Sequence, residues 1–292
     1  MMTTATAPAG PVRTIGVARL LRSELRWIFR RPRTIVVLAL LAVMPVIIGI
    51  GLAVVGGPTG RGGGEDGANG GGETLLAAAV GNALVLPIAA LGIGMGLLLP
   101  LVAAMAGADA IAGEASHGTL RGWLVAPVSR GRLLAVKTLG VGVVTLVAVT
   151  LMAVSGVITG LVLNGPDAVF TLSGTSLGFG GVVGKIALSV LWVTLQMWGV
   201  GAVALAISTC TEHPMLVVVS VLGGMIVFSM LRLLDALDWL HPFLLNESFI
   251  ALGDVLRDPV PASGLVEGAV RAGCYLVIGL SLAYARLITK DG

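Results

Sequence analysis

The sequence carries very little charge. Only 11% of its 292 residues are Asp, Glu, Lys or Arg, whereas soluble proteins average about 25%. Aromatic residues add 4%, so the 56% hydrophobic content is chiefly aliphatic. A chain with so few charges cannot cover its own surface in water, which excludes a soluble enzyme and a disordered protein. A net charge of +3 gives little support to nucleic-acid binding. The composition predicts an integral membrane protein.

The usual catalytic and metal-binding motifs are also missing. The two cysteines and three histidines form no H-E-x-x-H or Cys/His cluster, so no metal site is predicted. A G-x-S-x-G match at residues 174–178 lacks the strand–turn–helix context that makes it a nucleophile elbow. No phosphate loop, G-x-x-x-x-G-K-[ST], occurs, so the chain does not hydrolyse ATP by that route. The sequence predicts a non-catalytic protein.

Long apolar runs are what the chain does contain. A membrane-spanning helix needs about 20 apolar residues, and six runs qualify or nearly do. The second is too long for one straight helix, and its membrane part is predicted at residues 84–106. The last is short unless it extends back past Arg271, whose side chain would then snorkel to a headgroup. A seventh, partial span would follow if residues 243–252 enter the membrane. The six runs cover residues 34–55, 74–108, 138–166, 186–211, 213–231 and 272–285.

The basic residues are divided unequally between the two sides that six spans define. The side with both termini and residues 109–137 carries 13 of the 18 lysines and arginines. Because cytoplasmic loops are enriched in Lys and Arg, this bias predicts that both termini are cytoplasmic.

The rest of the chain divides into short segments around the spans. Residues 1–11 are predicted to be a disordered tail. Residues 12–33 are predicted to be an amphipathic interfacial helix, because apolar residues repeat on one face and arginines on another. Pro32 would end it before the six-span domain of residues 34–292. Within that domain the outer segment 232–267 is predicted to be one or two short helices, or else an ordered loop. The interfacial helix carries Arg19, Arg22, Arg26 and Arg30.

One charged segment, residues 109–137, contains a recognisable motif. It reads DAIAGEASHGTLRGWLVAPVSRGRLLAVK and is predicted to be a helix–turn–helix at the cytoplasmic surface between spans two and three. The segment resembles the first cytoplasmic loop of permease subunits of ATP-binding-cassette (ABC) exporters of type 2. The resemblance lies in the acidic Asp109, Gly113–Glu114, Gly118–Thr119–Leu120, Pro127 with Ser129–Arg130, and Lys137.

The resemblance implies a fold and a function. The fold is an all-α membrane protein with six transmembrane helices, the N-terminal interfacial helix and a cytoplasmic coupling helix. The implied function is that of a permease in a multidrug or antibiotic exporter of a bacterial plasma membrane, assembled as two permeases with two ABC ATPase subunits. The permease itself has no cofactor, since ATP and Mg²⁺ bind to the ATPase. The residues implied in coupling to the ATPase are Asp109, Glu114, Gly118, Thr119, Leu120, Arg121, Pro127, Arg130 and Lys137.

The spans contain a few uncharged polar and indole side chains that are candidates for the translocation path. Gln196 stands out because Trp192 and Trp198 flank it, although polar side chains within spans also hold helices together. The apolar spans favour an amphipathic drug, antibiotic or lipid-like cargo. A gradient-driven transporter and an intramembrane enzyme are the alternatives. The spans of this chain contain no carboxylate pair, which argues against both. The tentative path residues are Asn82, Thr145, Trp192, Thr194, Gln196 and Trp198.

The predicted topology can be tested with reporter fusions. A reporter active only in the cytoplasm should give signal when fused after Lys137 and none when fused after Gly72. Measuring both fusions in the same strain controls for expression. The opposite pattern would show that the charge bias has been assigned to the wrong side.

Overall fold

The computed structural model describes residues 22, 25–26, 28–55, 82–116, 130–165 and 178–289, and all regular structure within them is helical. In chain order the elements are α2 (Pro32–Val55), α4 (Val85–Gly96), α5 (Leu98–Ser116), α7 (Arg130–Asn164), α8 (Phe179–Cys210), α9 (Pro214–Leu231), the 3₁₀ helices η1 (Asp235–Phe243) and η2 (Leu245–Leu256), and α10 (Ala262–Thr289). The predicted all-α class is confirmed.

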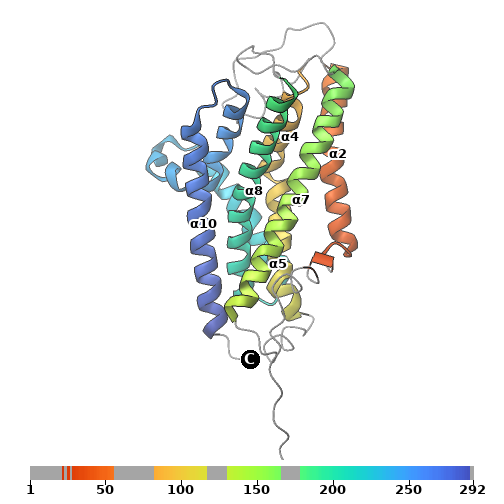
Figure 1. Cartoon of the computed structure of the whole chain (residues 1–292). Helices are drawn as coiled ribbons and strands as arrows, with labels where there is room; N and C mark the ends of the chain where they lie inside the picture. Colours follow the sequence, from red (N-terminus) through yellow and green to blue (C-terminus); the bar gives the residue numbers. More distant parts are fainter. Residues whose placement is uncertain are drawn as a thin grey trace, which may run out of the picture.

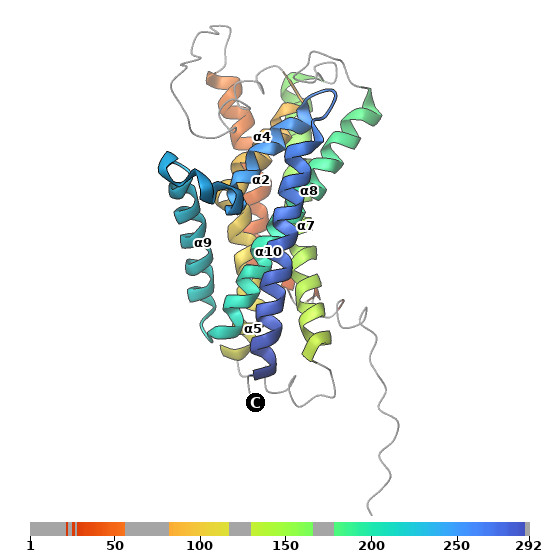
Figure 2. The ribbon, with the colours of Figure 1, turned by 90° about the vertical axis from the view of Figure 1, so that its left-hand side faces the viewer.

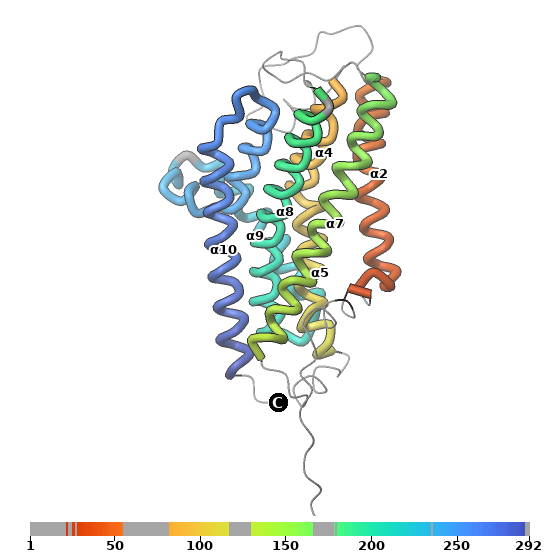
Figure 3. Tube along the Cα trace, viewed as in Figure 1, coloured from red at the N-terminus to blue at the C-terminus, as the bar shows by residue number. Residues whose placement is uncertain are grey.

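The helices run roughly side by side in one bundle (Figure 1). α8 lies near its centre and packs against α10, α5 and α7, whereas α2 lies at the edge against α7. The view turned by 90° places α9 at another edge (Figure 2). The beginning of α2 and the end of α10 lie toward the same end of the bundle (Figure 3). We call this the lower end and the opposite one the upper end.

Six helices are long and apolar enough to cross a membrane, as the apolar runs predicted. Several extend beyond the runs: α7 has 35 residues and α8 has 32. At about 1.5 Å per residue α7 is about 50 Å long, against a hydrocarbon thickness of about 30 Å. The ends of these helices therefore project past the hydrocarbon, and the lower end of α7 carries Lys137 beyond the start of the predicted run.

The second apolar run forms two helices. The break falls at Leu97, whose backbone leaves the helical conformation between α4 and α5. Pro100 lies in the first turn of α5, where its missing N–H costs no hydrogen bond. Most of α4 is buried inside the bundle, and α5 continues to Ser116, ten residues beyond the predicted end of the membrane segment at Ala106. The predicted membrane part, residues 84–106, thus falls on α4 and α5, and α5 continues past it into the charged segment 109–137. The position of the membrane boundary stays a prediction.

Small residues let the central helices approach closely. A Cβ atom on Gly107 of α5 would lie 2.6 Å from Cβ of Ala204 and 3.0 Å from the Gly201 carbonyl oxygen, both in α8. A Cβ atom on Gly279 of α10 would lie 2.8 Å from the backbone of Ala202 in α8. Side chains at Gly107 and Gly279 would therefore push α5 and α10 away from α8.

Within the predicted outer segment 232–267 the structure has the 3₁₀ helices η1 and η2, and residues 262–267 already belong to α10. η2 packs against α4, α8 and α10, and Leu245, Leu252, Val255 and Leu256 are buried. Lys185 of α8 donates hydrogen bonds from Nζ to the carbonyl oxygens of Val255 at 2.9 Å and Arg257 at 2.8 Å. A cation at the carbonyl end of a helix is favourable, so Lys185 fixes the end of η2.

Arg271 of α10 holds the beginning of η2. Its Nη1 donates to Ser248 Oγ at 2.7 Å and to the Leu244 carbonyl at 3.3 Å, and its Nη2 donates to Glu267 Oε1 at 2.6 Å. The side chain is only 9% exposed. The predicted snorkelling of Arg271 was therefore wrong, because η2 offers the guanidinium oxygen acceptors inside the protein. α10 does extend back past Arg271, to Ala262.

Pro32 was predicted to end the N-terminal helix, and in the structure it begins the first span instead. Phe29 and Arg30 form a turn, and Pro32 is the first residue of α2, a position that suits its fixed φ. Residues 22, 25, 26 and 28 are helical. Residues 1–11, which were predicted to be a disordered tail, lie outside the described residues. Arg19 and residues 174–177 of the G-x-S-x-G match lie outside them as well.

The role of Arg271 predicts a large effect of its removal. Replacing Arg271 with Met removes the charged hydrogen bonds to η2 and should lower the free energy of unfolding by about 2–3 kcal/mol. The matched control is Arg257→Met, because Arg257 is 62% exposed and its ion pair with Asp254 spans 3.6 Å. This control should cost about 0–1 kcal/mol. Denaturant unfolding in detergent measures both, and equal losses would contradict the role of Arg271.

Candidate functional site

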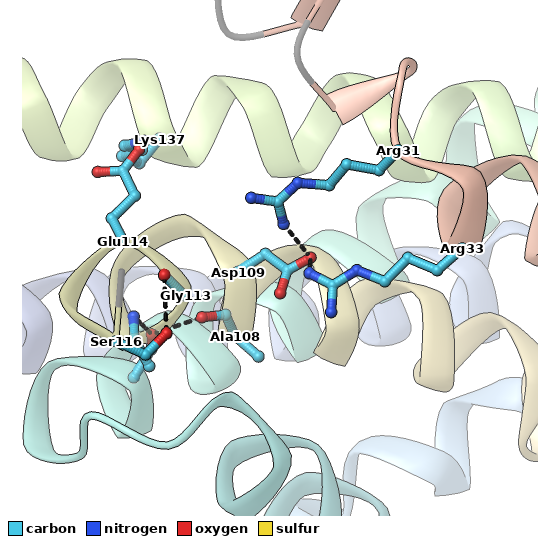
Figure 4. Close-up of polar contacts among 10 residues, drawn as sticks. Arg31, Arg33, Ala108, Asp109, Gly113, Glu114, Ser116 and Lys137 are labelled. Carbon is cyan, nitrogen blue, oxygen red and sulfur yellow. Dashed lines mark hydrogen bonds and ion pairs between the residues drawn. The ribbon is translucent and has the colours of Figure 1, made fainter. Parts of the chain in front are cut away.

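The last two turns of α5 carry two carboxylates at the lower end of the bundle. Asp109 and Glu114 lie on this helix just before residues 117–129, which fall outside the described part of the chain. Their spacing of five residues directs them to different neighbouring helices (Figure 4). Asp109 faces the start of α2, whereas Glu114 faces α7. We call Asp109, Glu114 and their partners the α5 hub.

Asp109 pairs with two arginines from the start of α2. Arg31 Nη1 donates to Asp109 Oδ2 at 2.7 Å, and Arg33 forms a second ion pair with the same oxygen. Pro32 between the two arginines begins α2 and fixes the direction in which the helix leaves the turn. Hydrogen bonds between guanidinium and carboxylate are among the stronger ones in proteins. Asp109 therefore joins the end of α5 to the start of α2.

Glu114 pairs with Lys137 of α7. Glu114 is 6% exposed and Lys137 is 2% exposed, and Nζ of the lysine donates to Oε1 of the glutamate. Charges this far from water are stable only when paired and hydrogen-bonded. The structure places Glu114 on α5 inside the bundle, next to α7. Its predicted role in coupling to the ATPase stays a prediction.

The hub is also joined to α8. The backbone N–H of Ala112 donates to Ser208 Oγ at 2.8 Å, and that hydroxyl donates to the Ala108 carbonyl at 3.2 Å. Ser208 is fully buried. Trp198 Nε1, also on α8, donates to the Thr138 carbonyl of α7 at 3.0 Å. Polar contacts therefore connect α5, α7 and α8 at this end.

Arg130 links the start of α7 to the end of α10. Its Nη1 donates to the Leu287 carbonyl at 2.7 Å and also to the Ile288 carbonyl. These are C-terminal carbonyls that have no partner within their own helix, and a cation is favourable there. Arg130 thus contacts the end of α10 within this chain, and its predicted role in coupling to the ATPase stays a prediction.

Taken together, these contacts make the lower end a junction of five helices. α5 is tied to α2, α7 and α8, and α7 is tied to α10. The segment 117–129 is bounded by α5 on one side and by Arg130 on the other. A displacement of this segment would therefore act on every one of these helices. Of the residues predicted to couple to an ATPase, Gly118, Thr119, Leu120, Arg121 and Pro127 lie outside the described residues.

The six tentative path residues are not gathered in one place. Trp192 donates its indole N–H to the Leu265 carbonyl of α10 at 2.9 Å, whereas Trp198 faces α7. The hydroxyl groups of Thr145 and Thr194 donate hydrogen bonds to carbonyl oxygens of their own helices. Asn82 Oδ1 accepts the Leu84 N–H at 3.0 Å, next to the beginning of α4. Their role in translocation stays a prediction.

Gln196 differs from the other path residues. It is fully buried on α8, and a Cβ atom on Gly268 of α10 would lie 3.3 Å from its Nε2. Neither Oε1 nor Nε2 has a hydrogen-bond partner among the described residues. A buried amide without partners costs about 1–3 kcal/mol. Gln196 therefore carries two unused hydrogen-bonding groups at the contact between α8 and α10.

Sequence reasoning missed the partners in the hub. Arg31 and Arg33 counted only toward the charge bias, and Ser208 only as one of several polar residues in the spans. Asp109 and Arg31 are 78 positions apart in the chain, and no periodicity links positions on different helices. In the described part of the chain no group of three or more His, Cys, Asp and Glu side chains is placed to hold a metal ion.

Comparison with known proteins gives one finding about the family. Residues 18–243 match the family described as ABC-2 family transporter protein. The matched range includes the α5 hub, with the start of α2 and the whole of α5 and α7. No curated protein matches the chain.

The buried pair of Glu114 and Lys137 generates a stability prediction. Glu114→Gln leaves the lysine charge uncompensated and should cost about 3–5 kcal/mol of unfolding free energy. The double variant Glu114→Gln/Lys137→Met removes both charges and should regain most of that loss. Denaturant unfolding of the two single variants and the double variant forms the cycle. Additive losses in the double variant would show that the pair is not coupled.

Proposed function

Because this chain belongs to the family of ABC-2 transporter proteins, we propose that it is the permease subunit of an ATP-driven exporter. Six apolar helices make it a multi-pass membrane protein, and the family assigns it a role in transport. In the proposed assembly ATP hydrolysis on a separate ABC ATPase drives cargo through a path between the helices. Both termini are cytoplasmic, and the membrane is a bacterial plasma membrane.

The observation that carries this function is the α5 hub. Residues 117–129 follow directly from a helix end that is bonded to α2, α7 and α8. A partner that presses on this segment moves α5, and the bonded helices follow because ion pairs and close packing resist separation. Such a rigid-body displacement of helices is a known means of switching between states. Force applied at the lower end would in this way reach the centre of the bundle.

The energy source is proposed to be the partner subunit. The sequence has no phosphate loop, and ABC-2 permeases associate with an ABC ATPase. ATP and Mg²⁺ would accordingly bind to that ATPase. The permease would contribute the surface on which it docks, centred on Gly118, Thr119, Leu120, Arg121 and Pro127.

The cargo is proposed to be an amphipathic drug, antibiotic or lipid-like molecule. The spans present aliphatic surfaces and few polar groups, which suits a largely apolar molecule with a small number of hydrogen-bonding groups. Gln196 would supply such hydrogen bonds when α8 and α10 separate, since both of its amide atoms lack partners in the closed arrangement.

The assembly is proposed to contain two permeases. α2 and α9 have only 17% of their most apolar window buried within the chain. A second permease copy would cover part of this exposed surface and complete the path, with lipid covering the remainder.

The coupling role can be tested on Asp109. In vesicles that contain the permease and its ATPase, Asp109→Asn should reduce cargo-stimulated ATP hydrolysis and export by about 5- to 150-fold, the range of typical coupling free energies. The matched control is Asp254→Asn, the same change at the upper end of the bundle, which should leave both rates close to those of the parent protein. The purified permease alone should hydrolyse no ATP.

Two results would contradict the proposed function, and a third would contradict the role of Gln196. The first is normal export by Asp109→Asn in an otherwise active assembly. The second is export that continues without ATP and stops when an ion gradient is collapsed, which would identify a secondary transporter. The third concerns Gln196→Ala, which should change which cargo is moved while basal ATP hydrolysis persists; unchanged cargo selection would remove Gln196 from the path.

A further inference from the structure

A pocket of about 480 Å³ lies between η1 and the upper part of α10. Pro242 and Phe243 of η1 form one wall, and α10 forms the other. Pockets of this size hold small molecules or parts of larger ones. Tyr275 of α10 ties the two walls together, since its hydroxyl donates a hydrogen bond to the Phe243 carbonyl at 2.7 Å.

The α10 wall of this pocket consists of two rows of residues with a spacing of four. Residues four apart lie above one another on the same face of a helix. At about 1.5 Å per residue, each row follows α10 for about 12 Å, so the pocket is elongated along the helix. The polar row is Glu267, Arg271 and Tyr275, and the apolar row is Val270, Cys274 and Ile278.

The charge that the polar row presents outward is negative. Glu267 is 68% exposed, whereas Arg271 is 9% exposed and directs its Nη1 inward to Ser248 of η2. Glu267 accepts a hydrogen bond from Arg271 at Oε1, and its Oε2 has no partner among the described residues. The oxygen of the Tyr275 hydroxyl can also accept, because toward Phe243 it is a donor. The row therefore offers two oxygen acceptors to a cation with N–H groups.

The length of α10 places these acceptors near a membrane surface. α10 has 28 residues and is about 42 Å long, about 12 Å more than the hydrocarbon thickness. With the excess shared equally, the hydrocarbon begins about 6 Å below the upper end of the helix. Glu267 lies about 8 Å below that end, near this boundary, whereas Ile278 lies well inside the hydrocarbon. The pocket thus has a polar end at the level of headgroups and an apolar end at the level of acyl chains.

The pocket opens on a face of α10 that the other helices of this chain leave uncovered. Only 22% of the most apolar window of α10 is buried within the chain. Val266 and Val277, which flank the pocket along the helix, are 59% and 63% exposed. Aliphatic side chains on such a face of a spanning helix lie against acyl chains, which are as apolar as they are. The molecule that reaches this pocket is therefore a lipid of the bilayer.

We propose that this pocket binds phosphatidylethanolamine. Its ammonium donates hydrogen bonds to Glu267 Oε2 and to the hydroxyl oxygen of Tyr275, and one acyl chain lies along Val270, Cys274 and Ile278. Phosphatidylcholine carries the same charges but has no N–H donor, and phosphatidylglycerol has no cation. Neither of them satisfies both acceptors. This lipid site requires only that the chain spans a membrane, and it does not depend on the cargo or the direction of transport.

The test measures which lipid the full-length protein retains. The protein is delipidated in detergent and mixed with equal amounts of phosphatidylethanolamine, phosphatidylcholine and phosphatidylglycerol, and retained lipid is counted by native mass spectrometry. The parent protein should retain phosphatidylethanolamine over each of the other two by about tenfold, the effect of one hydrogen bond to a charged group.

Two substitutions with matched controls locate the ammonium group. Glu267→Gln keeps the size of the side chain but removes its charge, and should lower the ratio of phosphatidylethanolamine to phosphatidylcholine by about tenfold. Glu212→Gln is the same change at an exposed position between α8 and α9 and should leave the ratio unchanged. Tyr275→Phe should lower the ratio by about threefold, and Tyr284→Phe, on α10 but outside the pocket, should not change it. The ratio is the readout, because a general disturbance of the pocket lowers the retention of both lipids.

Two exposed valines of α10 locate the acyl chain. Val270 lines the pocket and is 61% exposed, whereas Val277 does not line it and is 63% exposed. Val270→Phe places a ring in the apolar row and should remove most of the retained phosphatidylethanolamine. Val277→Phe adds the same ring outside the pocket and should retain as much lipid as the parent protein.

Three outcomes would overturn the lipid site. Equal retention of phosphatidylethanolamine and phosphatidylcholine by the parent protein would show that the two acceptors do not select the headgroup. An unchanged ratio in Glu267→Gln would remove the carboxylate from the site. Equal losses in Val270→Phe and Val277→Phe would spread the lipid over the whole surface of α10. Unfolding curves establish that each variant is folded, and Tyr275→Phe with its control decides the headgroup question if Glu267→Gln does not fold.

Discussion

Hydrocarbon offers no hydrogen bonds, so charged and polar side chains of a membrane bundle must find their partners within the protein or at the water surface. This chain meets the condition with very few charges, and it places them at the two ends of its helices. At the lower end Asp109 pairs with two arginines at the start of α2, and Glu114 pairs with Lys137 of α7. At the upper end Lys185 and Arg271 hold the 3₁₀ helices through carbonyl and hydroxyl oxygens. Between these ends the helices meet through aliphatic side chains and small residues.

In the proposed mechanism the lower end of the bundle receives the force from the ATPase, and the contact between α8 and α10 at the centre opens in response. Ion pairs at the α5 hub fix α5 to α2 and α7, and Ser208 fixes it to α8. The central contact of α8 with α10 contains the partnerless amide of Gln196. A tightly bonded end transmits a displacement, whereas a contact with an unsatisfied polar group is the less costly one to open. The same structure thus accommodates both the proposed coupling and the proposed cargo path.

The predicted spans agree with the structure better than the predicted surroundings of individual charged residues do. The six spans were predictable because each is an apolar run of membrane length. The helix ends were less predictable, because α5 and α7 extend beyond the apolar runs into charged sequence, where Glu114 and Lys137 pair with each other. Arg271 was assigned to a headgroup, but η2 folds back to offer it oxygens. Residues 117–129, which carry most of the predicted coupling motif, lie outside the described part of the chain.

What the sequence determined by itself is the class: low charge and six long apolar runs indicate a helical membrane protein, because a run of about 20 apolar residues has the length of a membrane-spanning helix, whose backbone hydrogen bonds are all internal. It also placed acidic and basic residues at the helix ends. Only the tertiary structure decided which of them meet. Asp109 with Arg31, Arg130 with the α10 carbonyls, and the pocket between η1 and α10 all join residues distant in the chain. Such pairings depend on the rotation and crossing of whole helices, which follow from side-chain packing among all of them and leave no periodic mark in any single helix.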